Sequence, residues 1–183
     1  WYLGAKRTWA VREYSDFTLS ALMFPERGSY FSPVLKGNQL PVTEEFYDYS
    51  VRMGGIVDYG EERGMDRLGE AIPQNRGLVD VNFIRRISER WRFAGQMFAN
   101  TDSELYRDFQ SDRFAHDQWR QNFGELSYEG PVYSISTLSQ WQQNDYDSLI
   151  EQSPNLRIDA GPAPVFGTKF SHSLALEYAI LKE

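Results

Sequence analysis

The sequence has no cysteine among its 183 residues and only two histidines. The absence of cysteine excludes disulfide frameworks, thiolate catalysis and zinc sites built from cysteine. His116 stands near Asp108, Asp112 and Asp117, but the spacing of these side chains matches no known ligand motif. We therefore expect a polar loop there and no metal site.

Signatures of catalysis are missing too. No serine stands in the G-x-S-x-G pattern of a nucleophile elbow, and no glycine-rich loop could hold a phosphate. The adjacent pairs Glu44–Glu45 and Glu61–Glu62 would point to opposite sides of a strand, so neither pair can work as a general acid and base. We expect neither an enzyme nor a bound cofactor.

Long apolar runs and excess positive charge are also absent. The net charge of −7 argues against a nucleic-acid-binding protein, because such proteins concentrate lysine and arginine. Mean hydropathy is −0.56, and no run approaches the roughly 18 apolar residues of a spanning helix. Aromatic residues nevertheless make up 15% of the chain. Such a composition still allows a membrane protein if each strand turns only one side to lipid.

What the sequence does have is a period of two. In the last segment one side of the predicted strand is mostly apolar and the other is small or polar, as alternation across a strand requires. The first side carries Phe170, His172, Leu174, Leu176, Tyr178 and Ile180, and the second carries Ser171, Ser173, Ala175, Glu177 and Ala179. The same alternation recurs upstream, in residues 47–53, 79–83, 91–99, 125–128 and 133–136.

The predicted connections between strands alternate in length. Short ones are 14–16, 88–90, 129–130 and 161–167, and long polar ones are 62–74, 102–118 and 144–153, provided that 30–36 is a further strand. About ten antiparallel strands of roughly ten residues result, a length that suits a tilted membrane-spanning strand. The adjacent Gly54 and Gly55 indicate a bulge or a tight bend. We predict an all-β fold, an antiparallel up-and-down segment of a transmembrane β-barrel with residues 1–183 in one barrel domain.

The two sides of such strands have different surroundings. Apolar residues such as Val79, Val81, Leu174 and Leu176 are predicted to face acyl chains. The predicted lumen-facing residues are Asp80, Asn82, Arg92, Gln96 and Glu125. Aromatic residues near strand ends are typical of the two girdles of a membrane barrel, although a soluble sandwich core also concentrates them. They are Trp9, Tyr14, Phe46, Tyr47, Trp91, Trp119, Phe123, Tyr128, Tyr133 and Trp141.

From Arg76 to Tyr178 the order of features resembles a known family. The stretch RGLVDVNFIRRISERWRFAGQMFANTDSELYRDF reads as a strand, a tight turn, a strand and a loop that carries Tyr106, Arg107, Asp108 and Phe109. The hairpin FGELSYEGPVYSISTLSQWQQND follows, and then SPNLRIDAGPAPVFGTKFSHSLALEYA. Together they are similar to the lipopolysaccharide-assembly outer-membrane proteins of the LptD family, also called OstA or Imp.

This resemblance implies a role in the outer membrane of Gram-negative bacteria. The family's barrel receives lipopolysaccharide (LPS) from a periplasmic bridge and inserts it into the outer leaflet, with an LptE-like lipoprotein plug inside the barrel. The expected partners are therefore LPS, outer-membrane lipid, the plug and the bridge, and no nucleic acid. We expect this chain to supply part of the barrel wall, without the family's N-terminal jellyroll or its closing strands.

Two other functions remain open from the sequence alone. A porin-like general or substrate-specific channel would share every physical feature above, and only the order of the family-like segments speaks against it. A soluble β-sandwich that binds carbohydrate would show shorter strands and two sheets packed face to face.

Overall fold

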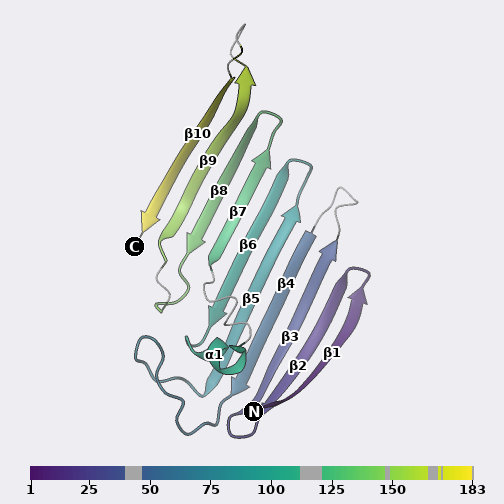
Figure 1. Cartoon of the computed structure of the whole chain (residues 1–183), viewed down its shortest axis with the longest axis vertical. Helices are drawn as coiled ribbons and strands as arrows, with labels where there is room; N and C mark the ends of the chain where they lie inside the picture. Colours follow the sequence, from purple (N-terminus) through teal and green to yellow (C-terminus); the bar gives the residue numbers. More distant parts are fainter. Residues whose placement is uncertain (40–46, 112–120, 147–148, 165–168, 170, 183) are drawn as a thin grey trace.

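The computed structural model describes residues 1–39, 47–111, 121–146, 149–164, 169 and 171–182. Ten strands in this part of the chain form one antiparallel sheet, in which they stand in the order of the sequence (Figure 1). The strands are β1 (Leu3–Arg12), β2 (Ser15–Phe24), β3 (Gly28–Gln39), β4 (Tyr47–Val57), β5 (Asn75–Arg86), β6 (Trp91–Asn100), β7 (Asn122–Glu129), β8 (Tyr133–Trp141), β9 (Glu151–Pro164) and β10 (Ser171–Lys182). The prediction of about ten up-and-down strands, including one at 30–36, is therefore confirmed.

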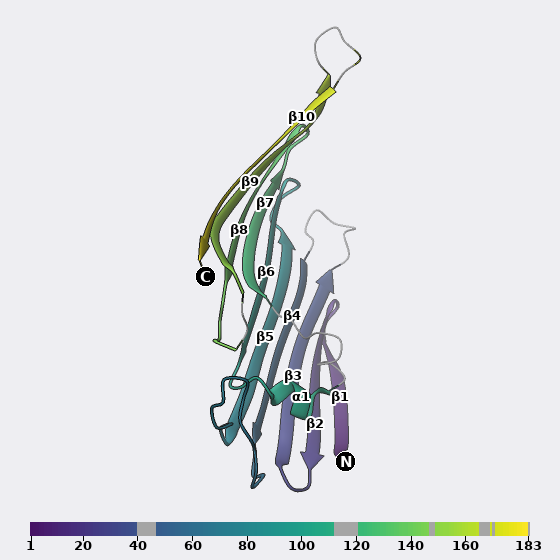
Figure 2. The ribbon, with the colours of Figure 1, turned by 60° about the vertical axis from the view of Figure 1, so that its left-hand side comes forward.

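The strands are long and the sheet is open. β7 has 8 residues and β9 has 14, whereas strands of globular proteins usually have about five or six. β1 and β10 form the two edges, and the sheet bends and twists between them (Figure 2). A sandwich would need a second sheet, so the sandwich alternative is wrong for the described residues. Those residues contain no helix that is long and apolar enough to span a membrane.

Connections of different length lie at opposite ends of the strands (Figure 1). At the short-turn end, residues 13–14, 87–90 and 130–132 join successive strands. At the loop end, the long connections 58–74, 101–121 and 142–150 join them, and only the β2–β3 turn at 25–27 is short there. The short helix α1 (Leu105–Phe109) belongs to the second of these long connections.

The sheet has two chemically different faces, because directly paired residues of an antiparallel sheet share a side. We call the side on which α1 packs the α1 face and the other side the bare face. Large apolar residues lie on the bare face of every strand from β1 to β10. Examples, one from each strand, are Trp9, Leu19, Phe31, Val51, Val81, Met97, Leu126, Ile135, Ile158 and Leu176.

Aromatic residues gather on the bare face at the short-turn end. Ring pairs there span β1 to β8, with centroids 5.1 to 5.9 Å apart: Trp9–Phe17, Tyr47–Tyr49, Phe83–Phe93, Trp91–Tyr128 and Tyr128–Tyr133. Phe123 does not join them, because it pairs with Gln96 and so lies on the α1 face. Phe46 and Trp119 lie outside the described residues.

Of the two alternatives predicted at Gly54 and Gly55, a bulge or a tight bend, the bulge is wrong. Both residues pair with β5 without a shift of register, Gly54 with Leu78 and Gly55 with Gly77. A Cβ atom at Gly54 would overlap the hydroxyl of Tyr30. Gly54 is therefore a glycine because the buried side chain of Tyr30 lies across its α1 face.

Replacing Gly54 by alanine should destabilise the fold, because the new methyl group would displace Tyr30. Overpacking of this kind costs about 1–3 kcal/mol. Gly55→Ala is the matched control, since the nearest atom to its Cβ would be the carbonyl oxygen of Arg76 at 3.6 Å. Urea titration of the folded protein measures both variants. Equal midpoints for the two would contradict the assignment.

Candidate functional site

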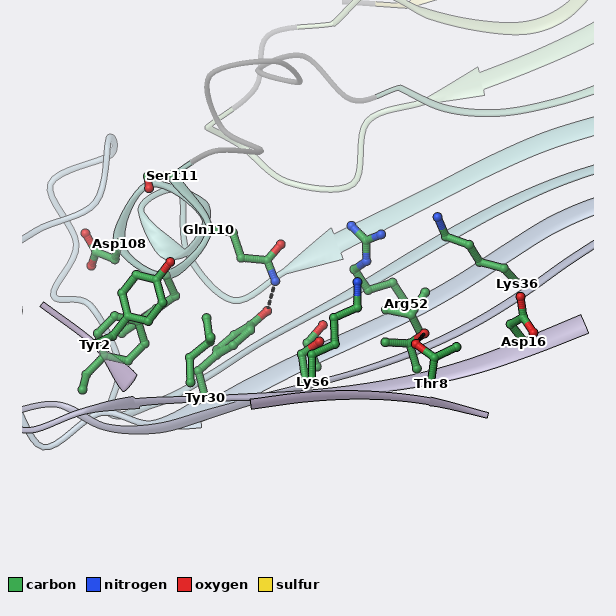
Figure 3. A pocket seen from close by; sticks show the side chains of 17 residues that line it. Tyr2, Lys6, Thr8, Asp16, Tyr30, Lys36, Arg52, Asp108, Gln110 and Ser111 are labelled. Carbon is green, nitrogen blue, oxygen red and sulfur yellow. Dashed lines mark hydrogen bonds between the residues drawn. The ribbon is translucent and has the colours of Figure 1, made fainter. Parts of the chain in front are cut away.

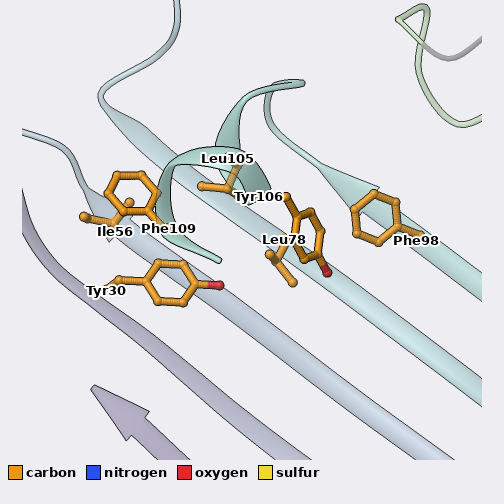
Figure 4. Packing of buried hydrophobic residues seen from close by; sticks show 7 residues of the cluster. All are labelled: Tyr30, Ile56, Leu78, Phe98, Leu105, Tyr106 and Phe109. Atoms are coloured by element: carbon orange, nitrogen blue, oxygen red, sulfur yellow. The ribbon is translucent and has the colours of Figure 1, made fainter. Parts of the chain in front are cut away.

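A buried hydrophobic cluster lies where α1 packs against the loop end of the sheet (Figure 4). Leu105 of α1 is fully buried, and Tyr106 and Phe109 are nearly so. They cover Leu78 of β5 and neighbouring apolar residues of the α1 face. The α1 face is otherwise largely polar, so this cluster fixes where the loop folds back on the sheet.

Local hydrogen bonds order the segment just before the helix. The carboxylate of Asp102 accepts a bond from the N–H of Glu104 at 3.1 Å and another from the hydroxyl of Thr101 at 3.0 Å. The hydroxyl of Ser103 donates to Glu104 and accepts a bond from the N–H of Arg67, which ties this loop to the β4–β5 loop. Five helical residues are too few to be stable in isolation, so the helix depends on these contacts and on packing.

Arg76 lies at the centre of a buried group of charges. Its guanidinium donates two hydrogen bonds to Asp102, at 2.9 and 2.6 Å. Its Nη1 donates to Asp58 at 3.1 Å and to Asp108 at 2.8 Å. The side chain of Arg76 is 0% exposed. One guanidinium therefore joins the start of β5 to the end of β4 and to both ends of the α1 segment.

A second arginine reaches the same carboxylates from the β2–β3 turn. Arg27 donates to Asp58 at 3.2 Å and to Asp108 at 3.0 Å. We call these five side chains the charge cluster: Arg27, Arg76, Asp58, Asp102 and Asp108. Three carboxylates face two guanidiniums, so the cluster carries one net negative charge by formal count.

Phe109 fills the space beside the charge cluster. The guanidinium of Arg27 lies 4.7 Å from its ring centroid and that of Arg76 lies 5.0 Å away. The ring also stacks on Tyr30 at 5.8 Å and meets the edge of Phe24 at 5.0 Å. A cation over the face of an aromatic ring is attracted to it electrostatically, and the attraction is stronger where water is excluded. Phe109 therefore links the charges to the apolar cluster.

The environment of Asp58 lowers its pKa. Burial alone would raise that pKa, but hydrogen bonds from Arg27, from the N–H of Gly60 and from Arg76 outweigh it. These donors bind the charged carboxylate better than the protonated one. Asp58 is thus a carboxylate at neutral pH, and its side chain is completely shielded from solvent.

A cavity of about 510 Å³ lies beside this cluster on the α1 face (Figure 3). Strands β1 to β4 form one wall, and residues 108–111 close the loop end. Gln110 donates a hydrogen bond to the hydroxyl of Tyr30 at 2.6 Å and so fixes this closure. The described residues contain no group of histidine and acidic side chains that could hold a metal ion, and His116 lies outside them.

The structure places the residues singled out in the sequence in two regions. Asp80, Asn82, Arg92, Gln96 and Glu125 share the α1 face, as their pairing across β5, β6 and β7 requires. They do not join the charge cluster. Asp80 accepts a hydrogen bond from Asn82 at 2.9 Å and stands directly opposite Arg52.

Three of the four family-like loop residues belong to the site. Tyr106, Asp108 and Phe109 face the sheet, whereas Arg107 is 62% exposed and pairs with Glu104. Sequence reasoning missed the remaining members of the charge cluster, which are Arg27, Asp58, Arg76 and Asp102. Arg76 alternates with Leu78 and Asp80, which could have put it on the polar side, but nothing in the sequence pairs it with carboxylates 18 to 32 positions away.

Comparison of the sequence with protein-family models and with curated proteins gives no significant match. The family-like order of segments from Arg76 to Tyr178 therefore stays a prediction.

Arg76→Met should release the α1 segment, because it leaves buried carboxylates without their main cation. Loss of one partner of a buried ion pair costs about 3–5 kcal/mol. Arg157→Met removes the same kind of side chain from the exposed pair with Asp159, whose side chains are 57% and 37% exposed, and should cost much less, because exposed ion pairs contribute little to stability. The test is to measure the free energy of unfolding of both variants. An equal loss of stability in the two would refute the central role of Arg76.

Acid should weaken the loop end through Asp58. Because the pKa of Asp58 is lower in the folded state than in the unfolded state, its stabilisation is complete above the unfolded value of about 4 and is lost as the pH falls through the folded value. Asp58→Asn should therefore be less stable at pH 7 and should lose less stability on acidification. Unfolding midpoints between pH 7 and pH 3 measure this, and parallel curves would contradict it.

Proposed function

We propose that the chain is part of the wall of a β-barrel in the outer membrane of Gram-negative bacteria. In this proposal the bare face contacts lipid and the α1 face lines an aqueous lumen. The observation that carries the proposal is the contrast between the two faces across all ten strands. Alternation of apolar and polar side chains along every strand is what a membrane barrel requires.

The exposure of the bare face supports this placement. On β10 alone, Leu174, Leu176, Tyr178 and Ile180 are each at least 50% exposed. Soluble monomers rarely expose continuous apolar surfaces of this extent. A lipid surface would cover the whole face, including the part formed by β9 and β10.

The aromatic pairs and the loops support an orientation. Girdles of aromatic rings mark the level of the lipid headgroups in membrane barrels, whose turns are short on the periplasmic side and whose loops are longer outside. We therefore place the aromatic ring pairs at the periplasmic boundary and the charge cluster at the extracellular end. In this orientation α1 narrows the lumen near its outer opening.

The more specific function that we propose is LPS transport. The chain would form part of a translocon that inserts LPS into the outer leaflet, with an LptE-like plug and a periplasmic LPS bridge as partners. The resemblance from Arg76 to Tyr178 is the support for this function. The family-like residues Tyr106, Asp108 and Phe109 pack against the proposed lumen wall, where a loop could contact passing glycan or a plug.

A porin-like channel is the second candidate. The observation in its favour is α1 itself, because a loop segment folded against the inner wall narrows a pore and can select solutes. This function needs no plug and no periplasmic bridge.

Depletion of the intact protein separates the two candidates. Loss of LPS from the cell surface, with solute uptake unchanged, is expected for the translocon. Loss of uptake with normal surface LPS would favour the channel. The protein should fractionate with outer membranes, require detergent for extraction and change its gel mobility on boiling. A protein that stays soluble without detergent would refute both candidates.

Val81→Arg and Asn82→Arg test the assignment of the faces with neighbouring residues. Val81 lies on the bare face and Asn82 on the α1 face. An arginine in the middle of the lipid should cost about 2–4 kcal/mol, and much less in the lumen. The fraction of protein that becomes folded in outer membranes should therefore fall for Val81→Arg alone. Equal assembly defects would contradict the proposal.

A further inference from the structure

The cavity on the α1 face changes character from one end to the other (Figure 3). At the loop end its wall is apolar and is formed by Tyr2, Leu22 and Phe24, with Tyr30 and Phe109 beside them. Further toward the short-turn end the wall carries hydroxyl groups and the cationic side chains of Lys6, Arg52 and Lys36.

The aromatic rings of the loop end are packed against one another. Ring centroids are 5.5 Å apart for Tyr2 and Phe24, 5.0 Å for Phe24 and Phe109, and 5.8 Å for the stacked pair Tyr30 and Phe109. Tyr30 and Phe109 therefore cover one face of each other, whereas Tyr2 is 55% exposed. Together with Leu22, these rings form an apolar wall against which an apolar body can pack.

Among the described residues, Asp16 and Asp108 are the acidic groups that line the cavity, and neither forms an ion pair with Lys6. Asp108 binds Arg27 and Arg76. In the register of the sheet, Asp16 stands opposite Lys36.

Asp80 stands opposite Arg52 in the same register. Lys6 stands opposite Ser20, one row of side chains from Leu22. Within the part of the chain that the structure describes, Lys6 has no ion-pair partner. The cavity thus combines an apolar end with a neighbouring cation that no acid balances.

We propose that this cavity binds an amphipathic anion, a small molecule with an apolar or aromatic body and one phosphate or carboxylate group. The body lies against Leu22 and Phe24, and the anionic group lies at Lys6. A volume of about 510 Å³ is in the usual range for sites of small ligands. The proposal rests on the cavity and goes beyond the transport function, because it does not depend on what the barrel carries.

Phenyl phosphate is the probe, because it has an aromatic body and is too polar to partition strongly into lipid. Isothermal titration calorimetry on the intact protein in lipid nanodiscs should detect its binding. Lys6→Ala should weaken binding about tenfold, the usual effect of losing a hydrogen bond to a charged group. Arg7→Ala is the matched control: it removes a cation from the same strand, but on the bare face beside Trp9. Equal effects of the two variants would overturn the proposal.

Further probes test the two parts of the ligand on the unmodified protein, whatever the variants do. Benzyl alcohol has the body without the charge, and inorganic phosphate has the charge without the body. Both should bind at least about tenfold more weakly than phenyl phosphate. Glucose 6-phosphate tests for a sugar site, and binding tighter than that of phenyl phosphate would overturn the proposal. So would a failure of phenyl phosphate to bind at millimolar concentration.

Discussion

The loop end of this molecule depends on one constraint, the burial of a charge that cannot be neutralised. An arginine keeps its proton in proteins, so a completely buried Arg76 must be surrounded by acceptors. Asp58, Asp102 and Asp108 supply them. Asp58 belongs to the β4–β5 connection, and Asp102 and Asp108 belong to the β6–β7 connection. A single side chain therefore ties these two connections to each other.

The other features of the loop end follow from this arrangement. With Asp102 and Asp108 held at both ends, five residues of helix are enough to place Leu105 and Phe109 on the sheet. Phe109 in turn forms the apolar limit of the cavity, next to Tyr30, and Tyr30 requires the absence of a side chain at Gly54. The need of Arg76 in β5 for carboxylate partners thus determines where Phe109 packs on Tyr30 of β3.

Sequence reasoning predicts the sheet well and the loop end poorly. Alternation is a local property, so it places Val81 and Asn82 on opposite faces, and it gives the strand order once the turns are known. The bulge expected at Gly54 is wrong because this glycine makes room for Tyr30 of the neighbouring strand. The girdle position expected for Phe123 fails for a local reason, since alternation within β7 puts Phe123 on the same side as Glu125. The pairing of Arg27 with Asp108 joins positions 81 residues apart. Periodicity within a segment carries no information about such a contact.

The order of the strands also affects how the sheet can form. Each strand pairs with the strands before and after it in the sequence. The sheet can therefore grow by adding one strand at a time to its existing edge. Most such steps close only a few residues and lose little chain entropy, which favours rapid folding. The connection that carries α1 is much longer, and β7 must join β6 across it. The charge cluster holds the first part of that connection, at Asp102 and Asp108, against the ends of β4 and β5. Once it has formed, fewer residues remain to be ordered when β7 pairs with β6.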